Sequence, residues 1–154
     1  MNNPEKYMKI AYKLAQKAAE QDEVPVGCVI VYQDKVIARG YNTRKNREST
    51  LDHAEMVAIR KANKKIGSWR LEDCAIYVTL EPCSMCAGAL QQARIKEIYY
   101  GATDKKAGAL GGLYNMYDVK GFNHYPEVHG GIMREECSKI LSDFFRKLRN
   151  KPSN

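Results

Sequence analysis

The sequence has no apolar run long enough to cross a membrane. Its longest apolar stretch, Val24 to Tyr32, is far shorter than the roughly 20 residues that a transmembrane helix needs. The N-terminus, M-N-N-P-E-K-Y-M-K-I, also lacks the apolar segment of a secretory signal. We therefore expect a cytoplasmic chain with no membrane partner, kept in a reducing compartment.

In a reducing compartment disulfides are disfavoured, so cysteine serves better as a metal ligand or a small core residue. Only one pair of cysteines, Cys83 and Cys86, has C-x-x-C spacing, and no second such pair completes a four-cysteine site. The other three stand singly in strand or helix patterns and are expected to be buried: Cys28, Cys74 and Cys137. Histidine is equally scarce, with three in the chain: His53, His124 and His129.

The composition is that of a soluble globular domain with a basic surface. Of 154 residues, 44% are hydrophobic and 28% charged, and the formal net charge is +7. Positive charge favours a polyanionic partner such as nucleic acid, although it also aids solubility. Two stretches concentrate it, a polar loop and the C-terminus: Arg44, Lys45 and Arg47, then Arg146, Lys147, Arg149 and Lys151.

Hydrophobic periodicity predicts one α/β domain in which helices cover a mixed sheet. The expected helices are 4–19, 54–64, 83–92 and 133–148. The expected strands are 26–32, 35–41, 75–80 and 95–100, with a short edge strand around Val128. Strand 75–80, helix 83–92 and strand 95–100 are spaced as a right-handed βαβ unit with parallel strands. The glycine-containing segment 101–123 is expected to be a long functional loop.

The pair Cys83 and Cys86 follows Pro82 where a strand ends and a helix begins. Residues three apart share a helix face, so both sulfurs can reach one ion. The positive end of the helix dipole also favours the thiolate, which is the metal-binding form. Because a structural zinc site uses four protein ligands and a catalytic one keeps a position open, the number of further ligands decides the function.

His53 supplies a third ligand at the start of another helix, in the sequence D-H-A-E-M. Residues two apart lie on roughly opposite sides of a regular helix. Both His53 and Glu55 can therefore face one site only if His53 is at the helix entry and Glu55 in the first turn. The site would then have three protein ligands, a fourth position for water, and a carboxylate beside it.

This arrangement suits hydrolytic deamination. Zinc lowers the pKa of bound water, and a neighbouring carboxylate can carry the proton from that water to the departing amine. The pattern H-x-E…P-C-x-x-C is the known signature of zinc-dependent nucleobase deaminases. The alternative to a catalytic site is a structural zinc site or a C-x-x-C that binds no metal. His-Ala-Glu at a helix start and the βαβ context favour the catalytic site.

The sequence resembles the bacterial tRNA-specific adenosine deaminases of the cytidine deaminase superfamily, from about Tyr7 to Leu148. Shared more widely in the superfamily are V-P-V-G at 24–27 and Y-V-T-L-E-P-C-S-M-C-A-G at 77–88, and H-A-E stands at 53–55. The segments that indicate the tRNA branch are G-A-T-D-K-K at 101–106, F-N-H at 122–124 and S-D-F-F at 142–145.

The resemblance implies a single domain, residues 1–154, with a three-layer α/β/α cytidine deaminase-like fold and a central mixed sheet of about five strands. It implies one Zn²⁺ per subunit, held by His53, Cys83 and Cys86, with Glu55 as the catalytic proton shuttle. The implied reaction converts adenosine to inosine at the wobble position of a tRNA anticodon. The implied partners are a tRNA anticodon stem-loop and a second subunit in a homodimer.

By position in the family, Asn42 hydrogen-bonds the flipped adenosine, Val26 packs beside its ring, and the backbone of Ala54 contacts the base. The remaining implied contacts line the path of the anticodon loop: Asp104, Lys106, Asn123, Phe144, Phe145 and Arg149. Each has an ordinary alternative. Val26 can be core and Asn42 a turn cap, while residues 104–106 can be a solvated charge run. One phenylalanine can be core, and Arg149 a frayed helix end.

Several positions depart from the family's usual pattern. Asp52 stands where relatives often have a small or apolar residue, and it can be an N-cap or a residue that tunes the zinc ligand without binding the zinc itself. Gly112 replaces a common serine, and Tyr125-Pro126 stands where arginine is frequent. These departures concern loop contacts rather than the chemistry.

Two other functions remain open at this level. One is a deaminase of the same fold that acts on a free base or nucleotide, such as guanine, cytosine or deoxycytidylate. The other is a zinc-stabilised RNA-binding module without catalysis, which predicts four protein ligands and unfolding on chelation. Glu55 and the absence of an evident fourth ligand disfavour the second.

Overall fold

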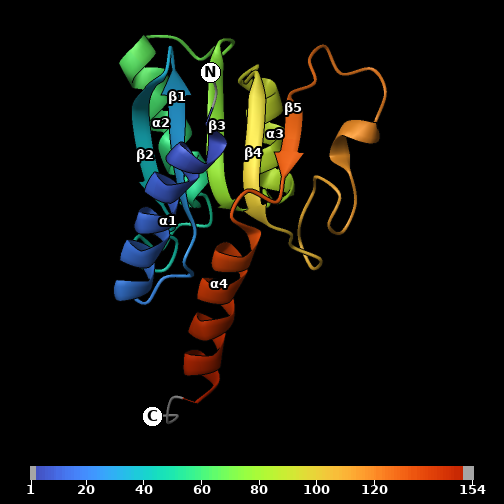
Figure 1. Ribbon diagram of the computed structural model, residues 1–154. Helices are drawn as coiled ribbons and strands as arrows, with labels where there is room; N and C mark the ends of the chain where they lie inside the picture. Colours follow the sequence, from blue (N-terminus) through green and yellow to red (C-terminus); the bar gives the residue numbers. More distant parts are fainter. Residues whose placement is uncertain (1–2, 151–154) are drawn as a thin grey trace.

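A five-stranded mixed sheet runs through the computed structural model, which describes residues 3–150 (Figure 1). Its order is β2-β1-β3-β4-β5, with β1 antiparallel to both neighbours and β3, β4 and β5 parallel. The strands are β1 (Gly27–Tyr32), β2 (Lys35–Tyr41), β3 (Cys74–Leu80), β4 (Glu97–Ala102) and β5 (Glu127–Gly130). The helices are α1 (Pro4–Glu20), α2 (Ala54–Ile66), α3 (Ser84–Gln92) and α4 (Arg134–Arg149). Of the basic C-terminal residues, Lys151 lies outside the described part.

The strands alternate between two cores, which is why the sheet is covered on both faces. Cys28 and Ile30 of β1 and Ile76 of β3 point to the side of α2 and α3. Val29 and Tyr77, the neighbours between them, point to the side of α1 and the start of α4. The period of two therefore produces an α/β/α arrangement of three layers, and the predicted fold class is confirmed.

Helix boundaries follow the local capping signals. Asn3 caps α1 by accepting from Lys6 N at 3.4 Å, with Pro4 in the first turn. Gly67 ends α2 in the left-handed conformation at φ 79°. None of the helices within residues 3–150 has both the length and the apolar character that crossing a bilayer requires.

The predicted bounds of the helices and of the four longer strands lie within two residues of those in the structure, and two of the differences have a local cause. β4 begins at Glu97 rather than at residue 95, because Ile95 N–H closes the end of α3 on Leu90 O at 3.2 Å. The predicted long loop contains a short 3₁₀ helix, Met116–Asp118, in which the side chain of Asn115 accepts from Tyr117 N. Otherwise the segment is irregular, and it is fastened to the rest of the fold by backbone hydrogen bonds.

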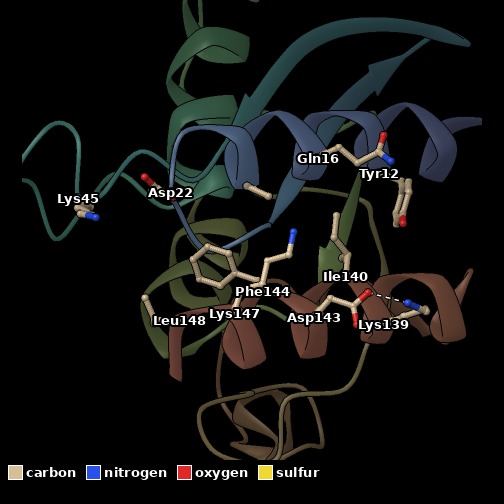
Figure 2. Close-up of a pocket in the computed structure, with 11 residues that line it drawn as sticks. Tyr12, Gln16, Asp22, Lys45, Lys139, Ile140, Asp143, Phe144, Lys147 and Leu148 are labelled. Atoms are coloured by element: carbon tan, nitrogen blue, oxygen red, sulfur yellow. Dashed lines mark hydrogen bonds and ion pairs between the residues drawn. The ribbon is translucent and has the colours of Figure 1, made fainter. Parts of the chain in front are cut away.

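Helix α4 lies beside α1 and extends past the end of the sheet (Figure 1). Figure 2 shows Tyr12 and Gln16 of α1 on one side of a hollow and Ile140 and Phe144 of α4 on the other. The hollow has a volume of about 460 Å³. The second half of α4 is therefore largely open to solvent, with Phe145 and Leu148 exposed.

Gly27 allows β1 to pack directly on the backbone of α1, and this contact generates a prediction. A Cβ at Gly27 would lie 2.2 Å from Ala11 O and 2.5 Å from Ala15 N, both backbone atoms. We expect Gly27→Ala to lower the free energy of unfolding by about 1–3 kcal/mol, because the helix must move away. Urea unfolding followed by circular dichroism measures the change.

Gly88→Ala is the matched control for this measurement. Gly88 lies inside α3, and a Cβ there would meet nothing within 4 Å. Alanine is the better helix former, so this variant should be as stable as the parent or up to about 1 kcal/mol more stable. Equal stability of the two variants would contradict the close packing of β1 on α1.

Candidate active site

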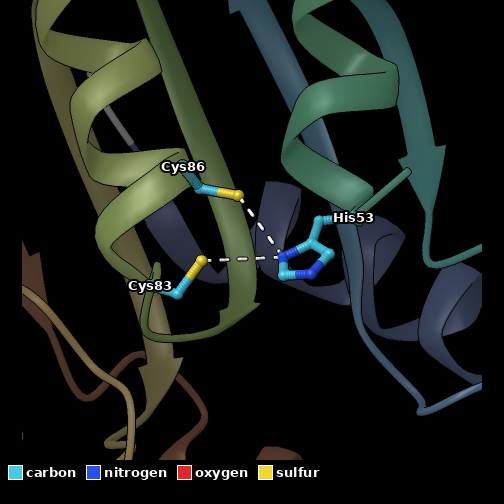
Figure 3. Close-up of side chains that lie close together, drawn as sticks. All are labelled: His53, Cys83 and Cys86. Carbon is cyan, nitrogen blue, oxygen red and sulfur yellow. Dashed lines mark hydrogen bonds between the residues drawn. The ribbon is translucent and has the colours of Figure 1, made fainter. Parts of the chain in front are cut away.

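Two helices begin at the same place, and they bring together the three side chains predicted as metal ligands. His53 is the N-cap residue of α2, and Cys83 is the N-cap residue of α3. Neither side chain caps its own helix, so both are available to the site. Cys86 follows in the first turn of α3 and points toward the same spot (Figure 3).

The spacing of the three ligand atoms fits a tetrahedral metal ion. Nδ1 of His53 lies 3.6 Å from Sγ of Cys83 and 3.6 Å from Sγ of Cys86. Bonds of about 2.0 Å to nitrogen and 2.3 Å to sulfur at tetrahedral angles place such atoms roughly 3.6 Å apart. One imidazole and two sulfurs are thus spaced so that they would hold a metal ion together. Within residues 3–150 this is one of two groups of His, Cys, Asp or Glu with metal-like spacing; the other is Glu97, Glu127 and His129 on the sheet edge.

The pKa values of the two cysteines shift in opposite directions because the cysteines share a hydrogen bond. Hydrogen bonds from the Cys86 thiol and from His53 hold the pKa of Cys83 well below that of a free thiol. The hydrogen bond to Cys83 and burial raise the pKa of Cys86. His53 has a raised pKa, chiefly through its hydrogen bond to Cys83. The lowered pKa of Cys83 favours the thiolate, the form that binds a metal ion.

Glu55 lies in the first turn of α2 and is almost completely buried, with 4% of its surface exposed. Burial raises its pKa to about 7. A carboxyl group with a pKa near neutrality can both accept and release a proton at physiological pH. Residues two apart on a regular helix face roughly opposite sides. His53 is the N-cap residue and precedes the first helical residue, so His53 and Glu55 can both face the site.

These residues line one cavity of about 150 Å³ together with several residues predicted to contact substrate. Val26, Asn42, Ala54 and Asp104 line it beside His53, Glu55 and Cys83. Asn42 also serves the turn, since its side chain accepts from Arg44 N at 3.3 Å and donates to Val24 O at 3.4 Å. The cavity therefore presents a carboxylate, an amide and apolar walls next to the metal-like site.

A hollow of about 700 Å³ adjoins this cavity, and other residues predicted to contact RNA line it. Lys106, Phe145 and Arg149 line it. Asp104, Val24 and Leu80 line both the cavity and this hollow, so the two lie next to each other. A basic and aromatic surface thus leads directly to the buried cavity.

Two predicted contacts lie elsewhere. Phe144 lines the hollow between α1 and α4 (Figure 2), while its neighbour Phe145 faces the basic one. Asn123 accepts from Gln91 Nε2 at 3.2 Å, near the end of α3. Neither of these residues lines the catalytic cavity.

Two positions that depart from the family pattern, Asp52 and Tyr125, make specific contacts in the structure. Asp52 is buried and is not the N-cap residue of α2, which is His53. Its carboxylate lies 3.8 Å from Nη1 of Arg60. The hydroxyl of Tyr125 donates to Val119 O at 2.6 Å and accepts from Phe122 N at 3.1 Å, which fixes that turn.

Sequence reasoning missed three residues of this region. Arg44, identified only as part of a basic loop, lines the catalytic cavity. Glu23 is buried and accepts from Lys45 N at 3.1 Å and Asn46 N at 2.6 Å, so it holds that loop in place. Glu81 is also buried and lines the cavity. An acidic residue just before V-P-V-G and another just before Pro82 were the available signals.

The comparisons with known proteins agree with this geometry. A model of the MafB19-like deaminases matches residues 2–149. The chain is 48% identical over 151 residues to a tRNA-specific adenosine deaminase of Bacillus subtilis (strain 168), covering 98% of this chain and 94% of the relative. It is 44% identical over 146 residues to one of Haemophilus influenzae, covering 94% and 84%.

Solved structures are similar in fold. One, from studies of A-to-I editing by tRNA:A34 deaminases at the wobble position of transfer RNA, has a TM-score of 0.84 and 40% identity. It covers 88% of this chain and 99% of its own. A guanine deaminase from Bacillus subtilis has a TM-score of 0.65 and 32% identity, and covers 100% and 98%.

The ligand geometry predicts metal binding that depends on both cysteines of α3. Loss of a residue that merely supports a ligand weakens metal affinity about 10–100-fold. We therefore expect at least that loss for Cys83→Ser and for Cys86→Ser, measured as divalent metal per chain after dialysis. Cys137→Ser is the control, because Cys137 is buried against the opposite face of the sheet. Equal metal content in all four proteins would contradict the assignment.

Proposed function

This chain belongs to the tRNA-specific adenosine deaminase family, and on that basis we propose that it converts adenosine to inosine at the wobble position of a tRNA anticodon. The observation that supports this most directly is the buried Glu55, which lines one cavity with His53 and Cys83, while Cys86 lies 3.6 Å from the same His53 nitrogen. These four residues are the set found in zinc-dependent nucleobase deaminases. They occur in a chain that is 48% identical to a tRNA-specific adenosine deaminase of Bacillus subtilis.

We assign the metal as Zn²⁺, one per chain, held by His53, Cys83 and Cys86. Bound zinc would act as a Lewis acid that makes water nucleophilic at neutral pH. Glu55 accepts a proton from the attacking water and delivers it to the departing amine. The burial that raises its pKa to about 7 suits both transfers. Mixed nitrogen and sulfur ligation with a free position is typical of catalytic zinc.

The cavity wall orients the base. Asn42 presents an amide that can donate to and accept from the edge of a purine, while Val26 offers an apolar surface to its ring. Ala54 lines the same cavity between His53 and Glu55, and we assign its backbone as the contact with the base. A base can enter so narrow a space only when it is unstacked from its neighbours, which favours a single-stranded loop over a duplex.

The adjoining hollow suits the rest of the anticodon loop. Lys106 and Arg149 provide positive charge for phosphates, and Phe145 provides an aromatic surface for stacking. Asp104 lies between the two hollows. Contacts with Asn123 and Phe144 would require RNA that extends beyond both hollows, and they stay predictions.

We further propose that residues 1–154 form one zinc-dependent nucleoside deaminase domain that acts in the cytoplasm as a homodimer. The family resemblance supports the domain and the dimer. Large apolar side chains are exposed on the segment between β4 and β5, namely Leu113, Tyr114, Val119 and Tyr125. Such a surface suits a subunit interface.

The reaction is tested by incubating the protein with a synthetic anticodon hairpin that carries adenosine at the wobble position. We expect a gain of about one dalton per molecule, because an amine becomes a carbonyl. Glu55→Ala should lower kcat by about 10²–10⁴-fold and keep its zinc, because Glu55 moves protons and does not ligate.

Glu72→Gln is the control, since Glu72 is exposed and pairs with Arg70 at the far end of β3. Full turnover by Glu55→Ala would remove the proton shuttle. Ammonia release from guanine or cytosine, with no change in the hairpin, would instead support a deaminase of free bases.

The basic hollow predicts salt-sensitive RNA binding. We expect Lys106→Ala and Arg149→Ala each to weaken hairpin binding and to reduce the slope of log K against log[salt] by about 1, with zinc content unchanged. Fluorescence anisotropy at several salt concentrations measures both quantities. Lys96→Ala is the matched control, because Lys96 is exposed just before β4, at the opposite end of that strand from Asp104. An unchanged slope for Arg149→Ala would place the RNA elsewhere.

A further inference from the structure

Glu81 is a buried carboxylate to which the reaction assigns no step. It connects β3 to the Pro82-Cys83 turn, and only 2% of its surface is exposed. Among the ion pairs of residues 3–150, none includes Glu81. A charge buried without a cation must be compensated by hydrogen bonds.

Three backbone N–H groups of one segment supply that compensation. Oε1 of Glu81 accepts from Asp104 N at 3.0 Å. Oε2 accepts from Leu110 N at 2.8 Å and from Gly112 N at 2.9 Å. The segment 104–112 is therefore folded around a single carboxylate.

Gly108 shows how closely this segment approaches. A Cβ at Gly108 would lie 2.4 Å from both Cδ and Oε2 of Glu81. Gly108 also forms an isolated β-bridge with Cys83, and Ala109 N donates to Pro82 O at 2.9 Å. The residue that replaces a common serine, Gly112, approaches Glu81 Oε1 as well. The segment is thus fastened both to the carboxylate and to the turn that carries a metal ligand.

The same segment forms one wall of the substrate path. Asp104 and Ala107 line the catalytic cavity, and Lys106 lines the basic hollow. We propose that Glu81 is a positioning residue for RNA. It fixes the segment 104–112 relative to the metal-binding turn, and it thereby keeps the path of the anticodon loop at a fixed position relative to the catalytic centre. The proposal rests on the proposed function, because it names what the wall positions.

Glu81→Gln tests the proposal at single-amide resolution. Glutamine has one acceptor oxygen in place of two. The oxygen is best used where Leu110 and Gly112 both donate, which turns the side-chain nitrogen toward Asp104 N–H, a donor facing a donor. We expect hydrogen exchange of the Asp104 amide to become at least about tenfold faster, while Leu110 and Gly112 stay protected.

The kinetic expectation separates positioning from chemistry. With an anticodon hairpin, Glu81→Gln should raise KM about tenfold, as expected for the loss of a hydrogen bond to a charged group, and change kcat less than about twofold. Zinc per chain should stay the same. Glu72→Gln, which removes the same charge at an exposed site before β3, should change neither quantity.

Other outcomes overturn the proposal. Loss of zinc, or a fall in kcat with KM unchanged, would mean that Glu81 supports the metal centre rather than the wall. A lower unfolding temperature with KM unchanged would leave it a purely structural residue.

If Glu81→Gln does not fold, the unmodified protein still provides a test. The amides of Asp104, Leu110 and Gly112 should exchange at least about tenfold more slowly than that of Lys105. Equal rates would contradict the hydrogen bonds from these amides to Glu81. This measurement needs no substrate. It therefore still applies if the hairpin is not deaminated, a result that would count against the proposed function alone.

Discussion

The active site depends on one geometric constraint: α2 and α3 begin next to each other, at the C-terminal end of β3. His53 and Cys83 are the residues that immediately precede these two helices, so the ligand set is fixed by where helical structure starts. The positive ends of both helix dipoles then point at the site. That field favours a thiolate at Cys83 and offsets part of the cost of burying Glu55 in the first turn of α2. Moving either helix by a single residue would turn its ligand away, since a helix rotates about 100° per residue.

Buried carboxylates recur around this site, and their surroundings explain how a basic protein tolerates them. Glu23 and Glu81 are stabilised by backbone N–H groups, and Glu55 by its place at a helix start. Lysine and arginine are left for the outside, where Lys106 and Arg149 line the open hollow. These charges thus differ in depth: Lys106 and Arg149 face the region suited to phosphates, whereas Glu55 lines the cavity and Glu23 and Glu81 hold neighbouring segments in place. A Lys or Arg paired with each buried carboxylate would have removed this separation.

The sequence allowed the strands, the helices and the ligand triad to be predicted, because each rests on a local signal. The short apolar runs of β1 and β3, the capping Asn3 and the helix-ending Gly67 are signals that span only a few residues. The roles of Glu23 and Glu81 could not be predicted in this way. Their partners are backbone amides more than twenty positions along the chain, and nothing in the identity of Lys45 or Leu110 signals that its N–H is needed. The two phenylalanines show a related limit. Periodicity placed both on α4, but adjacent helix residues face different directions, and only Phe145 faces the basic hollow.

Asp104 poses the remaining electrostatic question, since a carboxylate between the cavity and the basic hollow should repel phosphates. Its own segment answers it. The Asp104 carboxylate accepts from Lys106 N at 3.0 Å and from Ala107 N at 3.1 Å, so its charge is directed at backbone donors. At the same time its N–H is held by Glu81. Asp104 is therefore bound at both ends, by a buried carboxylate behind it and by its own turn in front. The wall owes its shape to these two sets of hydrogen bonds, and Lys106, which follows in the same turn, is left facing the open side where phosphates can approach.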